Sequence, residues 1–182
     1  MTDPIEIKNS FEVIGQEPHM WLAAAIRWKV IADHVGERLK ATLSPYPERR
    51  APYDDLVWFN NYMYLAGMAL ENLTKGIPIG RNPSVVSPDR FDLHSLVRSE
   101  GGHDLRELAQ KVAADLTADE VDLMKRLTEF IVWAGKYPIH RKASRTTHPS
   151  FKVGDPDRID AVFLRFAAIL RSEHPESTVG FG

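Results

Sequence analysis

The sequence predicts an all-α protein, an antiparallel four- to five-helix bundle with two long loops. Apolar residues recur at helical spacing in several segments, whereas strand-like runs are too short to build a sheet. Residues 77–103 form a long connection rich in Pro, Gly and Ser, and a second long loop spans residues 136–154. A chain of 182 residues has the length of one domain. We expect an N-terminal arm at 1–17, a helical bundle at 18–173 and a C-terminal tail at 174–182.

The first long helix is predicted to begin near Pro18, because proline suits the first turn of a helix, and to end before Ser44. Its apolar residues alternate in steps of four and three, which is typical of a bundle or coiled-coil seam. The seam is either the core of a monomer or an interface between two copies. It consists of Trp21, Ala25, Trp28, Ala32, Val35 and Leu39.

The second long helix is predicted from Asp54 to Gly76, where Gly76 and Pro78 are expected to end it. One face is a core stripe, and the opposite face carries Glu71 and Lys75 four residues apart, a spacing at which side chains meet. This pair is either an exposed ion pair or the floor of a groove or subunit interface. The core stripe consists of Phe59, Met63, Ala66, Leu70 and Leu73.

Three later helices are predicted from their start signals, and a short helical turn is expected within residues 91–97. A capping box satisfies two free amide groups at a helix start, and Asp-Pro also suits a first turn. The helices are expected to run to about Ala114, to Gly135 and to about residue 173. Their start signals are Asp104 with Glu107, Thr117 with Glu120, and Asp155 with Pro156.

Composition excludes several classes of protein. The net charge of −2 argues against a globally basic nucleic-acid binder. The absence of cysteine excludes disulfides, thiolate metal sites and a cysteine nucleophile, and it fits a cytoplasmic protein. We expect no signal peptide and no membrane association, because no suitable apolar run is present. No phosphate-binding loop, dinucleotide fingerprint or zinc-protease motif occurs, so we expect no cofactor and no metal.

A second candidate segment is Gly101-Gly102-His103-Asp104. The glycines permit a sharp turn, and Asp104 is expected to cap the following helix. His103 is either a structural hydrogen-bonding residue or an acid, a base or a phosphate ligand near neutral pH.

A third candidate segment is the end of the helix that begins after Thr117. Trp133 and Tyr137 are amphipathic and suit an interface or the edge of a pocket. Lys136 is favourably placed at the negative end of the helix dipole, which by itself explains it as a helix C-cap.

The loop from Lys136 to Lys152 is a local basic cluster that contains no acidic residue. It is either a solvated loop or a strip that contacts the phosphates of RNA or of a nucleotide. Besides its two ends, its basic residues are His140, Arg141, Lys142, Arg145 and His148.

Together these segments resemble the HEPN superfamily of bacterial and archaeal helical domains. The resemblance rests on the helix Tyr64–Lys75, on the Gly102–Leu105 segment, on Ile131–Pro138 and on their order, and it covers about residues 18–171. It implies an antiparallel helical bundle that is commonly dimeric. It also implies a role around nucleotides or RNA, often in toxin–antitoxin, anti-phage or related stress systems.

The RNase members of this family carry an Arg and a His separated by four to six residues. Of the three pairs with that spacing here, Arg141 with His148 follows the fourth long helix and lies nearest the expected place. The other two pairs are Arg27 with His34 and Arg98 with His103.

Three hypotheses about function follow. The first is a HEPN-like module that forms a homodimer and binds a nucleotide, RNA or an antitoxin-like protein partner. Its groove is framed by Glu71, Lys75, His103, Trp133 and Tyr137, with Asp104, Lys136 and Arg145 beside it. The second is a metal-independent endoribonuclease, with His148 as the base and Arg141 stabilising the phosphorane charge. The third is a purely structural dimerisation domain.

Overall fold

The computed structural model describes residues 11–42, 52–137, 150–152 and 154–175. The described chain is mostly helical and contains a two-stranded sheet, which confirms the predicted all-α class. In chain order its elements are α2 (Pro18–Thr42), α3 (Pro52–Arg81), η2 (Pro83–Val85), β1 (Val86–Ser87), β2 (Arg90–Phe91), α4 (Leu93–Leu96), η3 (Glu100–Gly102), α5 (Leu105–Val112), α6 (Ala118–Glu129), η4 (Phe130–Ala134) and α7 (Asp155–Glu173).

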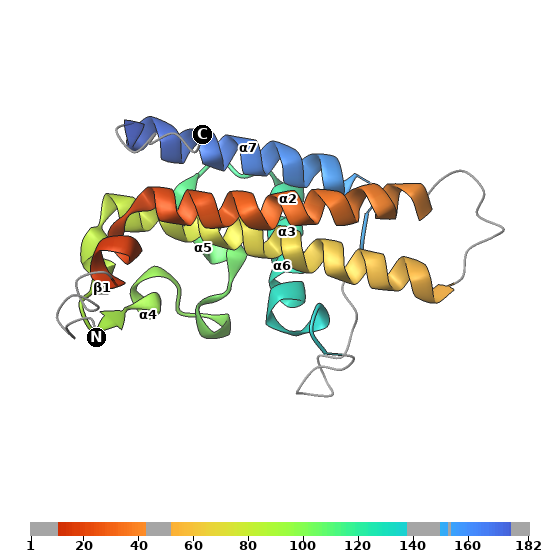
Figure 1. Ribbon diagram of the computed structural model, residues 1–182, viewed down its shortest axis with the longest axis horizontal. Helices are drawn as coiled ribbons and strands as arrows, with labels where there is room; N and C mark the ends of the chain where they lie inside the picture. The colour runs from red at the N-terminus through yellow and green to blue at the C-terminus, as the bar shows by residue number, and fades with distance from the viewer. Residues whose placement is uncertain (1–10, 43–51, 138–149, 153, 176–182) are drawn as a thin grey trace, which may run out of the picture.

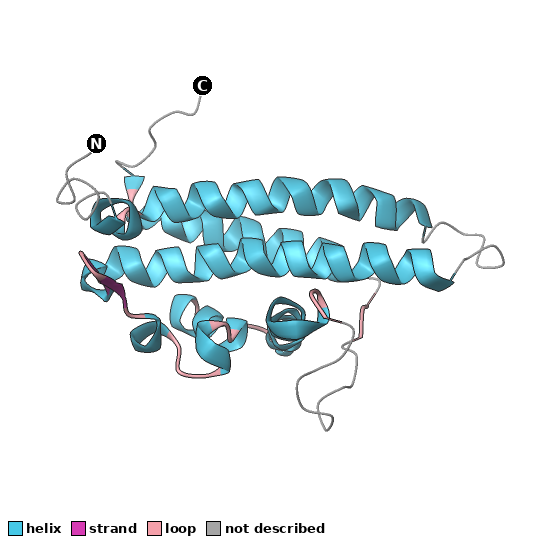
Figure 2. Ribbon diagram, turned by 60° about the horizontal axis from the view of Figure 1, so that its bottom comes forward, coloured by secondary structure: helices cyan, strands magenta, loops and turns pink. Residues whose placement is uncertain are grey.

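Helix α3 lies at the centre of the molecule. It packs against α2, α5, α6, η4 and α7. The long helices α2, α3 and α7 run lengthwise side by side, with α2 antiparallel to the other two (Figure 1). The shorter elements from β1 to η4 lie along one side of this group (Figure 2). A helix covered on several sides buries most of its side chains, so charged residues on α3 must either find partners or point to the remaining exposed face.

The apolar seam of α2 packs into the core of the single chain. Ala25, Ala32 and Leu39 are buried, and Trp21, Trp28 and Val35 pack against the same core. The contacts of α2 are mainly with α3. Of the two predicted roles for this seam, the structure therefore shows the intramolecular one.

Helix α3 is longer than predicted, because it continues through Gly76 and Pro78 to Arg81. Proline inside a helix removes one hydrogen bond and costs about 3 kcal/mol. The neighbouring Ile77 and Ile79 are fully buried, and burying two such side chains contributes roughly 1.5–3 kcal/mol each, which offsets that cost. The predicted end at Gly76 was wrong because burial of both isoleucines outweighs the local stop signal.

The connection after α3 contains structure that the sequence did not predict. Strands β1 and β2 pair antiparallel, Val86 opposite Phe91 and Ser87 opposite Arg90. Strands of two residues carry too short a pattern for recognition from alternation. The predicted helical turn within residues 91–97 is confirmed as α4.

The predicted capping box of α6 is confirmed, whereas at α5 only the Asp104 half of the predicted box forms. The Asp104 carboxylate accepts a hydrogen bond from the Glu107 amide at the start of α5. Thr117 and Glu120 form a complete, reciprocal capping box at the start of α6. The helix continues from α6 as one π-helical stretch, η4, and stops at Gly135 as predicted.

The start of α7 differs from its prediction. Gly154 is the N-cap, and Asp155 lies inside the first turn without capping the helix. The Asp155 side chain is fully buried and pairs with Arg126 of α6. The carboxylate was expected to satisfy the amides of its own helix, but it serves a cation from a neighbouring helix.

Part of the expected N-terminal arm is ordered against the rest of the chain. Residues 11–16 are helical. The Gln16 side-chain amide donates a hydrogen bond to the Val86 carbonyl at 2.8 Å. The Trp21 indole donates to the Gly15 carbonyl, also at 2.8 Å. This segment therefore links the start of α2 to β1.

Candidate functional site

The most unusual feature of α3 is a buried ion pair. Glu71 is 4% exposed and Lys75 is 5% exposed. The Lys75 ammonium donates a hydrogen bond to Glu71 Oε1. Charged side chains are almost never buried this deeply unless they are paired. Of the two predicted roles for this pair, an exposed surface bridge is excluded.

His103 reaches this buried pair because of the two glycines before it. Gly101 and Gly102 have φ angles of +63° and +94°, a region that favours glycine. The turn they make carries the imidazole back onto α3, where Nδ1 lies 2.8 Å from Glu71 Oε1. The His103 side chain stays 45% exposed. The sequence predicted this turn and a groove shared by His103, Glu71 and Lys75, but not the hydrogen bond between His103 and Glu71.

The protonation state of Glu71 determines how His103 is held. Burial alone would raise the pKa of Glu71, but the hydrogen bond from His103 and the charge of Lys75 outweigh it, so this pKa lies below its ordinary value. An ionised carboxylate only accepts hydrogen bonds, so His103 Nδ1 is the donor. The imidazole is thereby oriented with Nε2 as its remaining polar atom.

The second oxygen of this carboxylate differs from the first in its surroundings. Glu71 Oε2 is buried, and no described residue bonds to it. A buried acceptor without a partner costs about 1–3 kcal/mol. The site therefore carries a local cost that packing alone does not explain.

Asp104 supports the turn that presents His103. Its Oδ1 accepts from the Glu107 amide at 3.0 Å, and its Oδ2 lies 2.9 Å from the Ser99 hydroxyl. The Leu105 amide donates to the Thr128 hydroxyl of α6 at 3.0 Å. Asp104 was expected at a binding groove, and the described contacts of its carboxylate hold the backbone next to His103.

The Trp133–Tyr137 segment contacts an earlier part of α3 than Glu71. The Trp133 indole donates to Glu129 Oε2 at 2.6 Å. The Lys136 ammonium lies 5.8 Å from the centre of the Tyr64 ring, and Tyr137 is exposed. Tyr64 precedes Glu71 by seven residues, which is about 10 Å along a helix. The structure thus brings Glu71, Lys75 and His103 together. Lys136 lies apart from them, next to Tyr64 of α3.

The predicted catalytic residues, Arg141 and His148, lie outside the described residues, and so does Arg145. Lys152, at the end of the same basic loop, is described, and its ammonium pairs with Asp122 of α6 at 2.9 Å.

A second buried ion pair was missed by sequence reasoning. The Arg126 guanidinium holds Asp155 through two bonds of 2.5 and 2.8 Å, and both residues are buried. This pair joins α6 to α7. The sequence carried no signal for it beyond a charge within an amphipathic helix, because the partners lie 29 residues apart.

Comparison of the chain with family models, with curated proteins and with solved structures finds no match. None of the helices in the described ranges is long and apolar enough to cross a membrane. Within those same ranges, no group of three or more His, Asp or Glu side chains is arranged to hold a metal ion.

Proposed function

We propose that this chain is a HEPN-like antiparallel bundle of four to five helices that binds a phosphate-bearing ligand, a nucleotide or RNA, at His103. The observation that carries the proposal is the half-exposed His103 imidazole bonded to a buried Glu71–Lys75 pair. His103 Nε2 would contact the phosphate, as a donor when the ring is protonated.

The energetics of the buried pair support a functional role. A buried ion pair is often no more stabilising than well-packed apolar residues of similar volume. The structural needs of α3 could therefore be met by Leu or Met at positions 71 and 75. The polar pair does what those residues cannot, because it orients an imidazole at the surface through a charged hydrogen bond.

Charges around His103 fit an anionic ligand. Lys75 already neutralises Glu71, so the buried pair places no net negative charge beside His103. Arg98, on the same loop, is exposed, and Arg106 at the start of α5 is half-exposed and lies 3.4 Å from the Asp104 carboxylate. Arginine side chains in this setting suit phosphate oxygens, which they bind through paired N–H groups.

Binding is tested by fluorescence anisotropy with a labelled single-stranded RNA and a labelled nucleotide. We expect His103→Gln and Glu71→Gln to weaken binding by roughly tenfold, the loss of one charge-assisted hydrogen bond. His94→Gln is the matched control, since His94 is exposed on the neighbouring α4. Absence of binding to the wild type, or equal binding by His103→Gln, would refute the proposal.

The homodimer implied by the family resemblance is part of this proposal. Sedimentation equilibrium of the full chain measures its mass in solution directly. We expect a dimer, both alone and with RNA. A monomer at every concentration and with ligand would remove dimerisation from the account, while leaving the binding site to its own test.

A second candidate function is metal-independent cleavage of RNA, and the 2.8 Å contact between His103 and Glu71 favours it. A carboxylate that orients a histidine is a recurring arrangement for a general base. The base would take the proton from a 2′-hydroxyl, whose oxygen attacks the adjacent phosphorus. The bond to the 5′-oxygen breaks, that oxygen takes up a proton, and a cyclic phosphate remains.

Incubating the full chain with RNA and a metal chelator tests this candidate. Cleavage that is lost in His103→Ala would assign the base to His103. Cleavage that is lost only in His148→Ala or Arg141→Ala would assign the chemistry to the basic loop. If the wild type binds RNA but leaves it intact, the binding module alone remains.

A further inference from the structure

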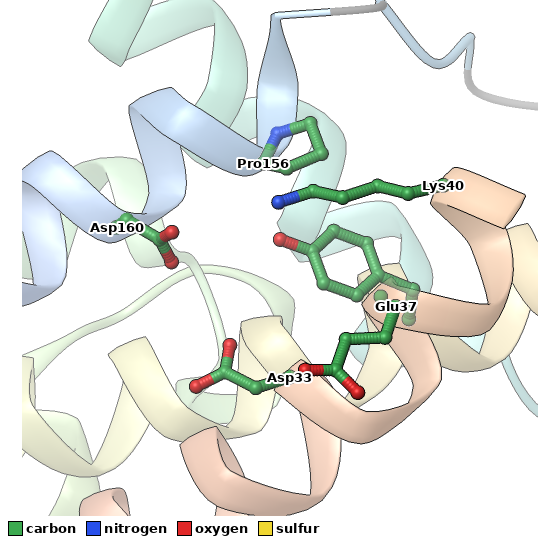
Figure 3. Close-up of a pocket in the computed structure, with 7 residues that line it drawn as sticks. Asp33, Glu37, Lys40, Pro156 and Asp160 are labelled. Atoms are coloured by element: carbon green, nitrogen blue, oxygen red, sulfur yellow. The ribbon is translucent and has the colours of Figure 1, made fainter. Parts of the chain in front are cut away.

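A pocket of about 300 Å³ opens on a different part of the molecule from His103. It is formed by α2, α3 and the start of α7 (Figure 3). This volume lies at the lower end of the range for small-molecule sites. The residues that line it are Asp33, Gly36, Glu37, Lys40, Tyr62, Pro156 and Asp160.

The Tyr62 side chain forms part of the wall of this pocket and carries a polar hydroxyl group. The residue is 2% exposed, and its hydroxyl has no hydrogen-bond partner among the described residues. Gly36 makes its position possible, because a Cβ at residue 36 would lie 2.9 Å from Tyr62 Cε2. Glycine inside a helix costs about 1 kcal/mol relative to alanine. Helix α2 bears that cost where the Tyr62 ring passes against it.

The pocket is negatively charged overall. The carboxylates of Asp33 and Asp160 share one cation, Lys29, whose ammonium lies 2.5 and 2.7 Å from them. Glu37 adds a third carboxylate to the wall. Burial, and then the charges of Asp160 and Asp33, raise the pKa of Tyr62 well above its ordinary value. Its hydroxyl therefore stays neutral, in a field that favours a cation.

Lys40 already extends its ammonium across this space toward Pro156 (Figure 3). No described carboxylate lies within ion-pair distance of that ammonium. The end of an unbranched alkylammonium chain thus occupies the mouth of the pocket, although Lys40 is held there only by its own helix. A ligand with the same terminal group would replace it and reach the Tyr62 hydroxyl.

We propose that this pocket binds the ammonium group of an unbranched alkylamine, with Tyr62 accepting a hydrogen bond from it and Glu37 and Asp160 neutralising its charge. The amine is either a free diamine or the side chain of a lysine in a partner peptide, since both present the same chemistry. Lys40 competes with the ligand, so its removal increases affinity. This site is independent of the one at His103.

Isothermal titration calorimetry of the full chain with 1,5-diaminopentane tests the proposal, with neutral 1,5-pentanediol as the ligand control. Tyr62→Phe should weaken binding by roughly tenfold, because one hydrogen bond to a charged group is lost. Glu37→Gln should weaken it by about threefold, as expected for a partly exposed charge. Lys40→Met should strengthen it by about threefold for the same reason.

Asp115→Asn is the matched control, since Asp115 is exposed on a distant connection between α5 and α6. Its affinity for the diamine should equal that of the wild type. A short lysine-containing peptide that binds where the diamine does not would support the proposal and assign the amine to a partner. The proposal would be overturned if neither the diamine nor the peptide binds to the wild type or to Lys40→Met. Equal binding of the diol would also overturn it.

Discussion

At the scale of single residues, Glu71 has the largest consequences. Its carboxylate bonds to both Lys75 and His103 through one oxygen and is almost completely buried. The spacing of Glu71 and Lys75 predicted their pairing, since residues four apart meet on a helix. Their burial could not be predicted, because it depends on a loop about thirty residues later that folds back over α3.

Replacing Glu71 with Gln should lower the free energy of unfolding by about 3 kcal/mol, because Lys75 would remain buried without its partner charge. Urea denaturation measures this loss. Glu37→Gln, at an exposed glutamate, should change the same quantity by less than about 0.5 kcal/mol. The double variant Glu71→Leu with Lys75→Met should recover most of the stability but not ligand binding. Equal effects of Glu71→Gln and Glu37→Gln would contradict the account.

The same carboxylate predicts a dependence of stability on pH. Its folded-state pKa lies below the ordinary value of 4.5. Its contribution is therefore fully present above that value and is lost as the pH falls through the folded-state pKa. Between pH 5 and pH 3, the stability of the wild type should fall more steeply than that of Glu71→Gln. Denaturant titrations at each pH measure both stabilities. If the two plots of stability against pH run parallel, ionised Glu71 does not stabilise the folded chain.

At the scale of elements, helix boundaries set by local signals were predicted, whereas features set by packing between elements were not. A cap is a local arrangement of a few residues, so Thr117 with Glu120 could be recognised from the sequence alone. The end of α3 depends on what covers Ile77 and Ile79, which local sequence does not contain. Asp155 illustrates the same limit, because its position predicted a cap, whereas its partner is Arg126.

The junction between α6 and α7 should be sensitive to Asp155. Asp155→Asn keeps the shape of the side chain but leaves the buried Arg126 with Asp122, a half-exposed carboxylate, as its remaining charge partner among the described residues. We expect a loss of about 3 kcal/mol in the free energy of unfolding, measured by urea denaturation. Asp119→Asn removes the more exposed partner of Arg158 on the same two helices and should cost less than about 1 kcal/mol. Similar losses in the two variants would mean that the buried Asp155–Arg126 pair contributes no more to the free energy of unfolding than an exposed pair.

At the scale of the whole molecule, periodicity and composition were enough to predict the all-α class. They were not enough to place residues 11–16, which form a short helix bonded to β1 and the start of α2. That contact crosses seventy residues of sequence, so no local pattern could indicate it. Of the residues expected to frame one groove, Glu71, Lys75 and His103 lie together. Lys136 lies beside Tyr64, two turns earlier on α3.

Removal of residues 1–17 should therefore destabilise the chain more than removal of residues 1–10. The longer deletion loses the Gln16 and Trp21 hydrogen bonds, which contribute about 1 kcal/mol each. We expect a difference of about 2 kcal/mol between the two shortened chains in denaturant unfolding. The same stability in both chains would mean that the segment 11–16 contributes nothing to the packed molecule.

The most direct test of the central claim is nuclear magnetic resonance of the ¹⁵N-labelled imidazole of His103 during titration with a nucleotide and with single-stranded RNA. We predict that Nδ1 carries a proton in the free protein and that the Nε2 resonance moves as ligand is added, with no such change for His94. An Nε2 resonance that stays in place while other residues of the protein respond to the ligand would contradict it.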